Sequence, residues 1–119
     1  MGEIMNSERE FIYFKIFDKS WDDMGLTDDD LIELENALLE NPTIGSVISG
    51  TGGVRKMRFM LPNNKGKSGG ARILYVDYVV HEKIALLTAY PKGEKDNITD
   101  KEKKLLKTQV EIFAKGLRK

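Results

Sequence analysis

Three cations in the middle of the chain are the residues best suited to chemistry. Lys56 and Arg58 lie two positions apart in a short apolar run, and Arg72 opens a second apolar run beyond a polar, glycine-rich loop. Arginine binds phosphate oxygens through a planar fork of N–H donors. Phosphoryl transfer depends mainly on positioning and on stabilising charge in the transition state. These residue types therefore suit a phosphodiester substrate.

An RNA substrate would need few further catalytic groups from the protein, because its own 2′-hydroxyl can be the nucleophile. Neither a metal ion nor a protein nucleophile is then needed. A lysine crowded by arginines has a lowered pKa, since a like charge disfavours its charged form, and such a lysine can act as general base. On these residues alone, a basic hairpin that only binds an anionic surface explains the sequence as well as an enzyme does.

The usual catalytic and metal-binding sets are missing from the sequence. It contains no cysteine, which removes thiolate chemistry and cysteine metal sites, and its one histidine, His81, lies in an expected hairpin turn. Thr51-Gly52-Gly53 precedes an expected strand rather than a helix, so it does not fit phosphate binding at a helix N-terminus. We therefore expect no cofactor and no metal.

Hydrophobic patterning predicts the elements that must position the cations. The expected order is a strand over residues 11–17, a helical turn over 18–24, a helix from the Thr27 cap to Asn41-Pro42, a connector over 43–49, strands over about 54–61, 71–79 and 83–90, and a last helix whose capping box pairs Thr99 with Glu102. This β-α-α-β-β-β-α order predicts an α+β domain with a mainly antiparallel twisted sheet. We expect the helices to cover one face, and the other face or a groove at its rim to serve function.

Alternation along the strand expected over residues 54–61 separates its side chains into two faces. Met57 and Phe59 point to the core, and Lys56 and Arg58 point the other way. If Arg72 shares their face, the hairpin presents a small cationic surface.

Three consecutive aspartates, Asp28, Asp29 and Asp30, resemble a metal-binding cluster. They follow Thr27, a good N-cap, and so occupy the first turn of the expected helix, where the helix dipole favours anions. Helix capping explains them better than a metal site does.

The net charge of zero hides an asymmetry along the chain. Residues 1–50 hold 12 acidic and 3 basic residues, a net charge of −9, whereas residues 51–119 hold 7 acidic and 16 basic residues, a net charge of +9. Such a split suggests an anionic partner for the C-terminal part. Two solvated faces that differ in sign explain it equally well.

Length and composition indicate one domain over residues 1–119, of which residues 1–10 form a flexible terminus. No run approaches the roughly 20 apolar residues of a membrane span, and the N-terminus lacks a signal-peptide apolar segment. The lack of cysteine is compatible with a reducing cytosol. We expect a cytoplasmic protein that makes no contact with membrane.

Three segments of the chain, residues 50–58, 66–75 and 86–92, closely resemble the HigB branch of the RelE/ParE toxin superfamily. The paired signature G-G-x-R-K-x-R and G-K-x-G-G-x-R-x-x-Y is fairly specific, and the resemblance extends from about Leu31 to the C-terminus. It implies a RelE-like fold and a type II toxin–antitoxin toxin that cleaves mRNA on the translating ribosome without a metal. It also implies three partners: a cognate helix-turn-helix antitoxin, mRNA and the decoding site of the 70S ribosome.

The resemblance also implies roles for individual residues. Lys56 or Lys92 would lie near the 2′-hydroxyl, and Arg58 and Arg72 would hold the scissile phosphate, so these four residues are the predicted catalytic set. Tyr90 would stack on a base or orient the nucleotide, although packing at a strand end explains it equally well. The predicted RNA-binding residues are Arg55, Lys65, Lys67 and Tyr90.

The C-terminal segment departs from the family pattern. Some RelE relatives carry a tyrosine or histidine there that assists chemistry, whereas residues 113–119 contain neither, which leaves the general acid unassigned. Two alternatives remain open. One is a ParE-like, non-enzymatic inhibitor of DNA gyrase, although such members lack the basic cluster. The other is an inactive module that only binds antitoxin or nucleic acid.

Overall fold

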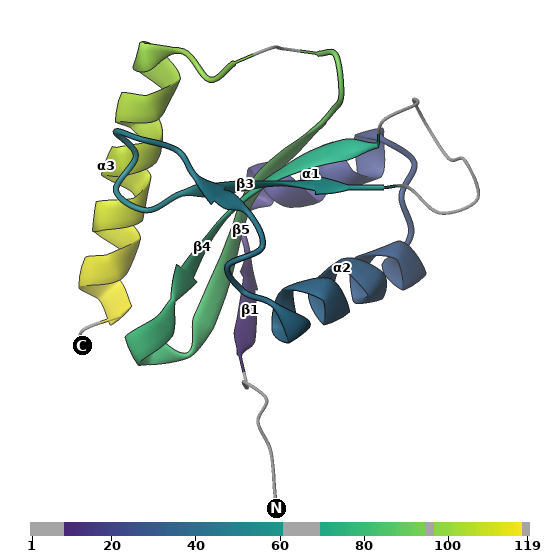
Figure 1. Ribbon diagram of the computed structural model, residues 1–119, viewed down its shortest axis with the longest axis horizontal. Helices are drawn as coiled ribbons and strands as arrows, with labels where there is room; N and C mark the ends of the chain where they lie inside the picture. The colour runs from purple at the N-terminus through teal and green to yellow at the C-terminus, as the bar shows by residue number, and fades with distance from the viewer. Residues whose placement is uncertain (1–8, 61–69, 95–96, 118–119) are drawn as a thin grey trace, which may run out of the picture.

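A five-stranded mixed sheet lies at the centre of the computed structural model, which describes residues 9–60, 70–94 and 97–117 (Figure 1). In spatial order its strands are β1 (Glu10–Tyr13), β5 (Lys83–Pro91), β4 (Ala71–Tyr78), β3 (Arg55–Phe59) and β2 (Ser46–Val47). β1 pairs with β5 in parallel, and the other pairs are antiparallel. The remaining elements are α1 (Lys15–Asp23), α2 (Asp28–Glu40), α3 (Asp100–Leu117) and the 3-10 turn η2 (Val79–His81). The predicted α+β class and mainly antiparallel sheet are confirmed.

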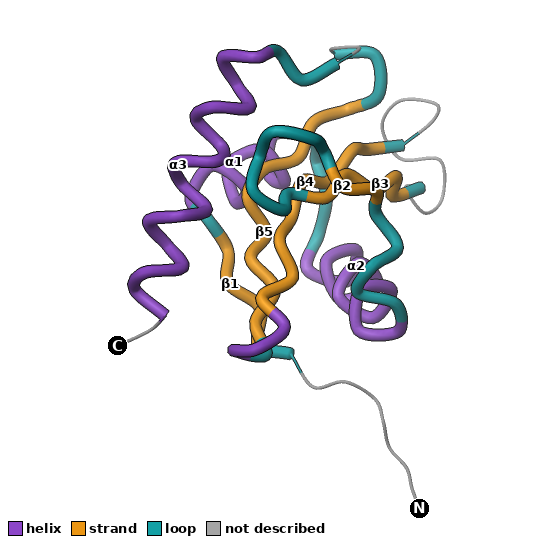
Figure 2. Tube along the Cα trace, turned by 60° about the vertical axis from the view of Figure 1, so that its left-hand side comes forward, coloured by secondary structure: helices purple, strands orange, loops and turns teal. Residues whose placement is uncertain are grey.

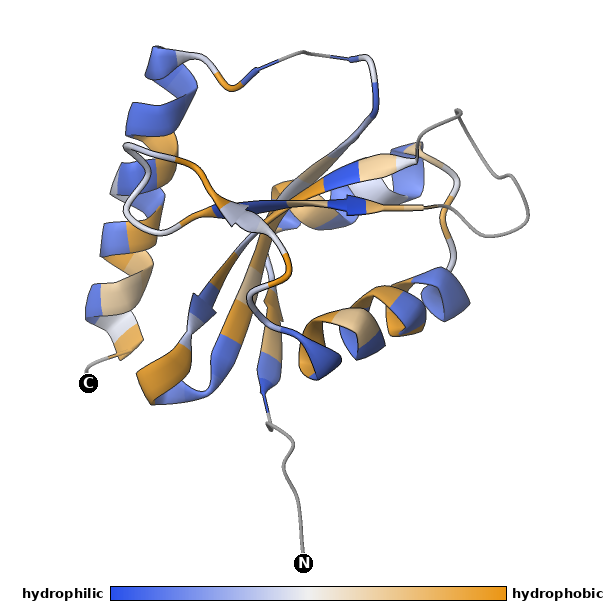
Figure 3. Ribbon diagram, in the orientation of Figure 1, coloured by the Kyte–Doolittle hydropathy of each residue, from blue (hydrophilic) through white to orange (hydrophobic). Residues whose placement is uncertain are grey.

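Each face of the sheet carries its own hydrophobic core. On one face, α1 and α2 bury Phe17 and Leu34 against strand residues such as Ile73. On the other face, α3 buries Leu106 and Val110 against further strand residues, and Figure 2 shows the sheet between α2 and α3. Figure 3 shows hydrophobic and hydrophilic bands along α3, as expected for a helix with one buried side. The expectation that helices cover only one face is therefore wrong.

The first strand is shorter than the sequence indicates. Extended backbone ends at Tyr13 and α1 begins at Lys15. Phe17 and Trp21, four residues apart, are the buried residues of α1, and their rings stack with centroids 5.4 Å apart. An aromatic run satisfies strand propensity, but here the helical i, i+4 pair prevails because it covers the core. The predicted strand over residues 14–17 is therefore wrong.

Both long helices start at the predicted caps. Thr27 Oγ1 accepts a hydrogen bond from the Asp30 N–H (3.2 Å), and the Asp30 carboxylate accepts one from the Thr27 N–H (2.9 Å). Thr99 and Glu102 form the same reciprocal pair before α3. Asp30 is thus a buried capping residue, as the sequence indicates. The short strand β2 lies inside the segment that the sequence predicts as a connector.

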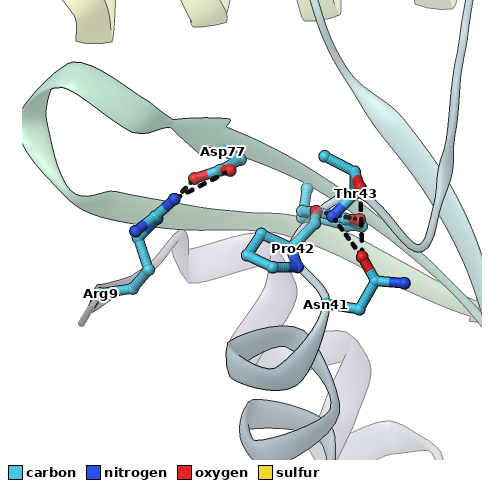
Figure 4. Close-up of polar contacts among 6 residues, drawn as sticks. Arg9, Asn41, Pro42, Thr43 and Asp77 are labelled. Atoms are coloured by element: carbon cyan, nitrogen blue, oxygen red, sulfur yellow. Dashed lines mark hydrogen bonds and ion pairs between the residues drawn. The ribbon is translucent and has the colours of Figure 1, made fainter. Parts of the chain in front are cut away.

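An ion pair and a backbone hydrogen bond hold the beginning of the described chain against the sheet. The Arg9 guanidinium forms an ion pair with Asp77 (2.8 Å), and the two side chains are only 11 % and 6 % exposed (Figure 4). The hydrogen bond to Asp77 raises the pKa of Arg9. The Glu10 N–H donates to the Glu82 carbonyl oxygen (2.9 Å). Residues 9 and 10, which the sequence assigns to a flexible terminus, therefore make long-range contacts, and residues 1–8 lie outside the described part.

Candidate active site

Strand register brings Arg58 and Arg72 together on one face of the sheet. Arg58 of β3 lies directly opposite Arg72 of β4, and Arg72 lies opposite Tyr90 of β5. Residues directly opposite each other in antiparallel strands have Cβ atoms about 4.5–5.5 Å apart and point to the same side. We call these three residues the Arg58–Arg72–Tyr90 row.

The neighbouring row on the same face contains Lys56. Lys56 lies opposite Leu74, and Leu74 lies opposite Thr88. Leu74 and Tyr90 both belong to the core under α3, so the two rows occupy the α3 face of the sheet. The three cations therefore share one face: the alternation of the sequence predicts this for Lys56 and Arg58, and the strand register adds Arg72.

The two arginines of the row repel each other, because like charges directly opposite in a sheet are destabilising. The side chain of Arg58 is exposed and that of Arg72 is half-buried. An anion bound between them would replace the repulsion with charge-assisted hydrogen bonds. The pair is therefore suited to binding an anion.

Lys92 lies at the same end of the sheet as the two arginines. Its N–H donates to the Gly70 carbonyl oxygen (3.0 Å), where β5 ends and β4 begins, and its side chain is exposed. Gly70 has a φ of +73°, and a Cβ at this position would collide with the Phe59 carbonyl oxygen. Only glycine fits where the chain enters β4 and Arg72 is placed.

The residues predicted to contact RNA lie in different places. Tyr90 is 5 % exposed and packs in the core under α3, beside the arginines of its row. Arg55 lies opposite Tyr75, whose side chain belongs to the core of the other face, so Arg55 is on the opposite face from Lys56. Lys65 and Lys67 lie outside the described residues.

Arg55 and Tyr75 hold the segment between α2 and β2. Arg55 Nη1 donates to the carbonyl oxygens of Gly45 (2.7 Å) and Thr43 (3.5 Å). The Tyr75 hydroxyl donates to the Pro42 carbonyl oxygen (2.7 Å) and accepts from the Gly45 N–H (3.0 Å). Burial raises the pKa of Tyr75. Arg55 therefore has structural partners in this segment, and the sequence pattern does not predict the anchoring role of the Tyr75 hydroxyl.

Figure 4 shows the start of that segment, directly after α2. The Asn41 side-chain oxygen accepts hydrogen bonds from the Thr43 N–H (3.3 Å) and hydroxyl (3.1 Å). An asparagine that binds the backbone two residues on forms a turn of its own. This turn ends α2 and directs the chain towards β2.

Two lysines of α3 lie against the glycine-rich loop that leads into β3. A Cβ on Gly50 would be 3.8 Å from Lys103 Cδ, and one on Gly52 would be 3.6 Å from Lys107 Cγ. Both glycines have a positive φ, +84° and +77°. The sequence indicates only a tight turn for these glycines, whereas the structure uses them to place two cations of α3 beside the loop that precedes Lys56.

Two kinds of feature are absent from residues 9–60, 70–94 and 97–117. No helix in these ranges is long and apolar enough to cross a membrane. No group of three or more histidine, cysteine, aspartate or glutamate side chains there could hold a metal ion.

Comparison with known proteins identifies the family. The model of the RelE toxin of the RelE/RelB toxin–antitoxin system matches residues 10–118. The E. coli toxin RelE, an arginine-to-alanine double mutant in the free state, is 16 % identical with a TM-score of 0.51, over 72 % of this chain and 85 % of that chain. A chain of the intact E. coli RelBE toxin–antitoxin complex is 19 % identical with a TM-score of 0.53, over 73 % and 99 %. These two structures share the fold, and the family match over nearly the whole length shows that the chain belongs to the RelE toxin family.

Proposed function

We propose that this RelE-family toxin is a metal-independent mRNA endoribonuclease that acts on the translating ribosome. The observation that supports the proposal most strongly is the placement of Arg58 directly opposite Arg72, with Lys56 on the same face. An anion bound between the two guanidinium groups would offset the repulsion between them. A phosphodiester is the anion that two planar guanidinium groups suit best. Assignment to the HigB branch remains a prediction from the three resembling sequence segments.

The proposed reaction begins with attack of the RNA 2′-hydroxyl on the adjacent phosphorus. Lys56 or Lys92 accepts the hydroxyl proton as general base. Arg58 and Arg72 stabilise the charge that develops on the phosphoryl oxygens. The bond to the 5′-oxygen of the next nucleotide breaks, and that oxygen takes up a proton. The products are a 2′,3′-cyclic phosphate and a 5′-hydroxyl end.

The distribution of charge supports an RNA partner on the α3 side. Lys103 and Lys107 lie beside the glycine-rich loop, on the helix that covers the face carrying Lys56. Clustered lysines of this kind bind phosphate backbones without reading sequence. The proposed partners are therefore mRNA and ribosomal RNA at the decoding site of the 70S ribosome, in the cytoplasm.

An antitoxin is the second proposed partner. The solved complex that this fold resembles is a toxin–antitoxin complex, and the matching family is that of a paired toxin. We expect a cognate antitoxin encoded with this chain, of the helix-turn-helix type that the sequence resemblance implies. Co-expression followed by co-purification tests this partner directly.

Mapping of 5′ ends in a reconstituted translation mixture tests the nuclease. Wild-type toxin should produce new mRNA ends at decoding-site codons without added metal, and Arg72→Ala should not. Lys19→Ala is a matched control, because Lys19 lies on α1 in an exposed pair with Asp23 (2.9 Å); it removes one positive charge on the other face. Uncut message with arrested growth would point to gyrase instead. Uncut message with normal growth would indicate an inactive binding module.

A further inference from the structure

A cavity of about 300 Å³ opens beside Tyr90, at the end of the sheet where β1 stops. β1 pairs with β5 only as far as Leu86, whereas β5 continues to Pro91. The place that a longer β1 would occupy is bordered by Ile16 and Ser20 of α1, and α3 closes the opposite side. Figure 2 shows α1 and α3 beside β5 beyond the end of β1.

The cavity walls combine apolar surface with a few polar groups. Its volume is at the lower end of the range for small-ligand sites, about 300–1,000 Å³, which suits one planar ring system. The principal apolar walls are Leu74, Tyr90, Ile98, Leu105 and Leu106. On the sides formed by β5, the segment after it and α3, the polar lining residues are Thr88, Glu94, Glu102 and Gln109. An apolar slot with a few polar groups at its edge is typical of a site that orients a flat heterocycle.

The cavity adjoins the candidate active site. Tyr90 lines the cavity and also ends the Arg58–Arg72–Tyr90 row. Leu74 and Thr88 line it too, and they share their row with Lys56. The cavity therefore begins one strand away from Arg72, on the side of Tyr90.

The charges around the cavity distinguish a base from a phosphate. Its charged groups are the carboxylates of Glu94 and Glu102, which repel phosphate and leave the backbone to the arginines. A carboxylate accepts hydrogen bonds from exocyclic amino groups, and a glutamine side chain both accepts and donates. Glu102 already accepts the Thr99 N–H (2.9 Å) in the cap of α3, so Glu94 and Gln109 are the groups placed to read a base.

We propose that this cavity is a base-recognition subsite that holds one unstacked base of the RNA and favours an amino-bearing base over uracil. This rests on the proposed function for the identity of the substrate. Single-stranded RNA is generally read in this way, with splayed bases packed against aromatic side chains and hydrogen-bonded at their edges. Uracil has no exocyclic amino group, so it makes fewer hydrogen bonds to Glu94.

Direct RNA binding tests the subsite without requiring cleavage. Fluorescence anisotropy compares Kd for labelled single-stranded hexamers of A, C and U on wild type, Leu105→Trp and Glu94→Gln. Leu105 is 58 % exposed, so a tryptophan there fills the mouth without breaking the core. We expect A or C to bind about tenfold more tightly than U, as one good polar contact provides, and both variants to reduce that ratio severalfold. Arg72→Ala should weaken all hexamers alike, because it removes a phosphate contact.

Ile112→Trp is the matched control for the added ring. Ile112 is 65 % exposed on the same helix and does not line the cavity, so this variant should keep the wild-type ratio. Equal binding of all hexamers by wild type would overturn the proposal, as would a ratio that Leu105→Trp leaves unchanged. If Leu105→Trp loses antitoxin binding but keeps the wild-type ratio of hexamer Kd values, the proposal is overturned, and a protein segment is the occupant of the cavity.

The cleavage assay separates failure of the subsite from failure of the nuclease. On messages with randomised decoding-site codons, Leu105→Trp should flatten the base composition at one position of the cut sites while cuts remain. Unchanged composition would contradict the subsite and leave the nuclease standing. If no message is cut by any variant, the nuclease fails, and the hexamer ratios still decide whether the cavity binds a base.

Discussion

The two faces of the sheet use the same residue type in opposite ways. On the face covered by α1 and α2, Arg55 donates to the carbonyl oxygens of Gly45 and Thr43 and so holds a connector in place. On the α3 face, three residues further along β3, Arg58 lies opposite Arg72. The first arginine stabilises the fold through neutral acceptors, and the second lies against a like charge. The face of the sheet on which an arginine of β3 lies therefore decides whether that arginine is structural or a candidate for chemistry.

The outer surfaces of the two sides differ in charge as well. The side of α1 and α2 exposes acidic side chains: Asp18, Asp22, Asp23, Asp28, Asp29 and Glu33. The α3 side exposes Lys101, Lys104, Lys107 and Lys115. Opposite fields on two sides of a small domain orient it as it approaches a polyanion. The charge asymmetry of the sequence is therefore an asymmetry in space, which favours docking of a polyanion to the α3 side.

Arg72→Ala should produce the largest effect, and it should fall on activity. Removing one charge-stabilising donor from a transition state costs about 10²–10³-fold in rate. The free energy of unfolding should not fall through loss of this pair, since the substitution relieves repulsion from Arg58. Single-turnover cleavage on ribosomes and urea unfolding measure the two quantities. Arg55→Ala is the contrasting variant, with a loss of about 1–3 kcal/mol in unfolding free energy.

Gly70→Ala should damage both stability and the site. A Cβ at this position would meet the Phe59 carbonyl oxygen at the entry to β4, and the residue has a φ of +73°. Strain and displacement together should cost about 3 kcal/mol or more. Gly93→Ala is the control, because Gly93 also has a positive φ, +93°, but its Cβ would meet no atom within 4 Å. Urea unfolding measures the loss of unfolding free energy. Equal losses in the two variants would show that steric contact is not the cause.

Much of this arrangement can be predicted from the sequence, because it depends on local rules. Period-two alternation places Lys56 and Arg58 on one face of β3, and the pairs Thr27–Asp30 and Thr99–Glu102 mark two helix starts. The structural role of Arg55 cannot be predicted in the same way. Its acceptors are backbone carbonyls of an irregular connector, whose path depends on a tyrosine hydroxyl about thirty residues away.

The cavity could not be predicted because it depends on where one strand ends. The aromatic run over residues 11–17 indicates a strand of full length, which would have covered the edge of β5 beyond Leu86. The chain instead turns into α1 after Tyr13, because Phe17 and Trp21 together complete a core. Strand propensity and helical spacing conflict in this segment, and tertiary packing resolves the conflict. A predicted first strand that is four residues too long therefore leaves no room for the cavity.

Tyr75→Phe tests the face that carries the structural arginine. The substitution removes a hydroxyl that bonds both the Pro42 carbonyl oxygen and the Gly45 N–H, and Tyr75 is fully buried. Leaving a buried N–H without its acceptor costs about 1–3 kcal/mol, which urea unfolding measures. Tyr13→Phe is the control, because the Tyr13 hydroxyl bonds Glu35 at an exposed position and surface changes stay within about 0.5 kcal/mol. A loss no larger than that of Tyr13→Phe would show that the connector is held without this hydroxyl.

The smallest expected effect is a pH dependence on the α3 face. Burial raises the pKa of Tyr78 to about 12, and its hydroxyl donates to the Val110 carbonyl oxygen of α3 (3.2 Å). A tyrosine whose pKa is higher in the folded state stabilises the fold fully below its unfolded pKa, near 10. That stabilisation is lost as the pH rises towards 12, because the buried phenolate is disfavoured. Solvent near the half-buried ring limits the change to about 1 kcal/mol.

Tyr78→Phe isolates that contribution. At pH 8 the variant should be less stable than wild type by about 0.5–1.5 kcal/mol, the usual worth of one hydrogen bond. Between pH 10 and 12 the gap should narrow, since only wild type can ionise at this position. Urea unfolding of both proteins at pH 8, 10 and 11.5 measures the gap. A gap that is equally large at every pH would show that Tyr78 titrates alike in the folded and unfolded chains, so the contact between its hydroxyl and α3 would then be open to water.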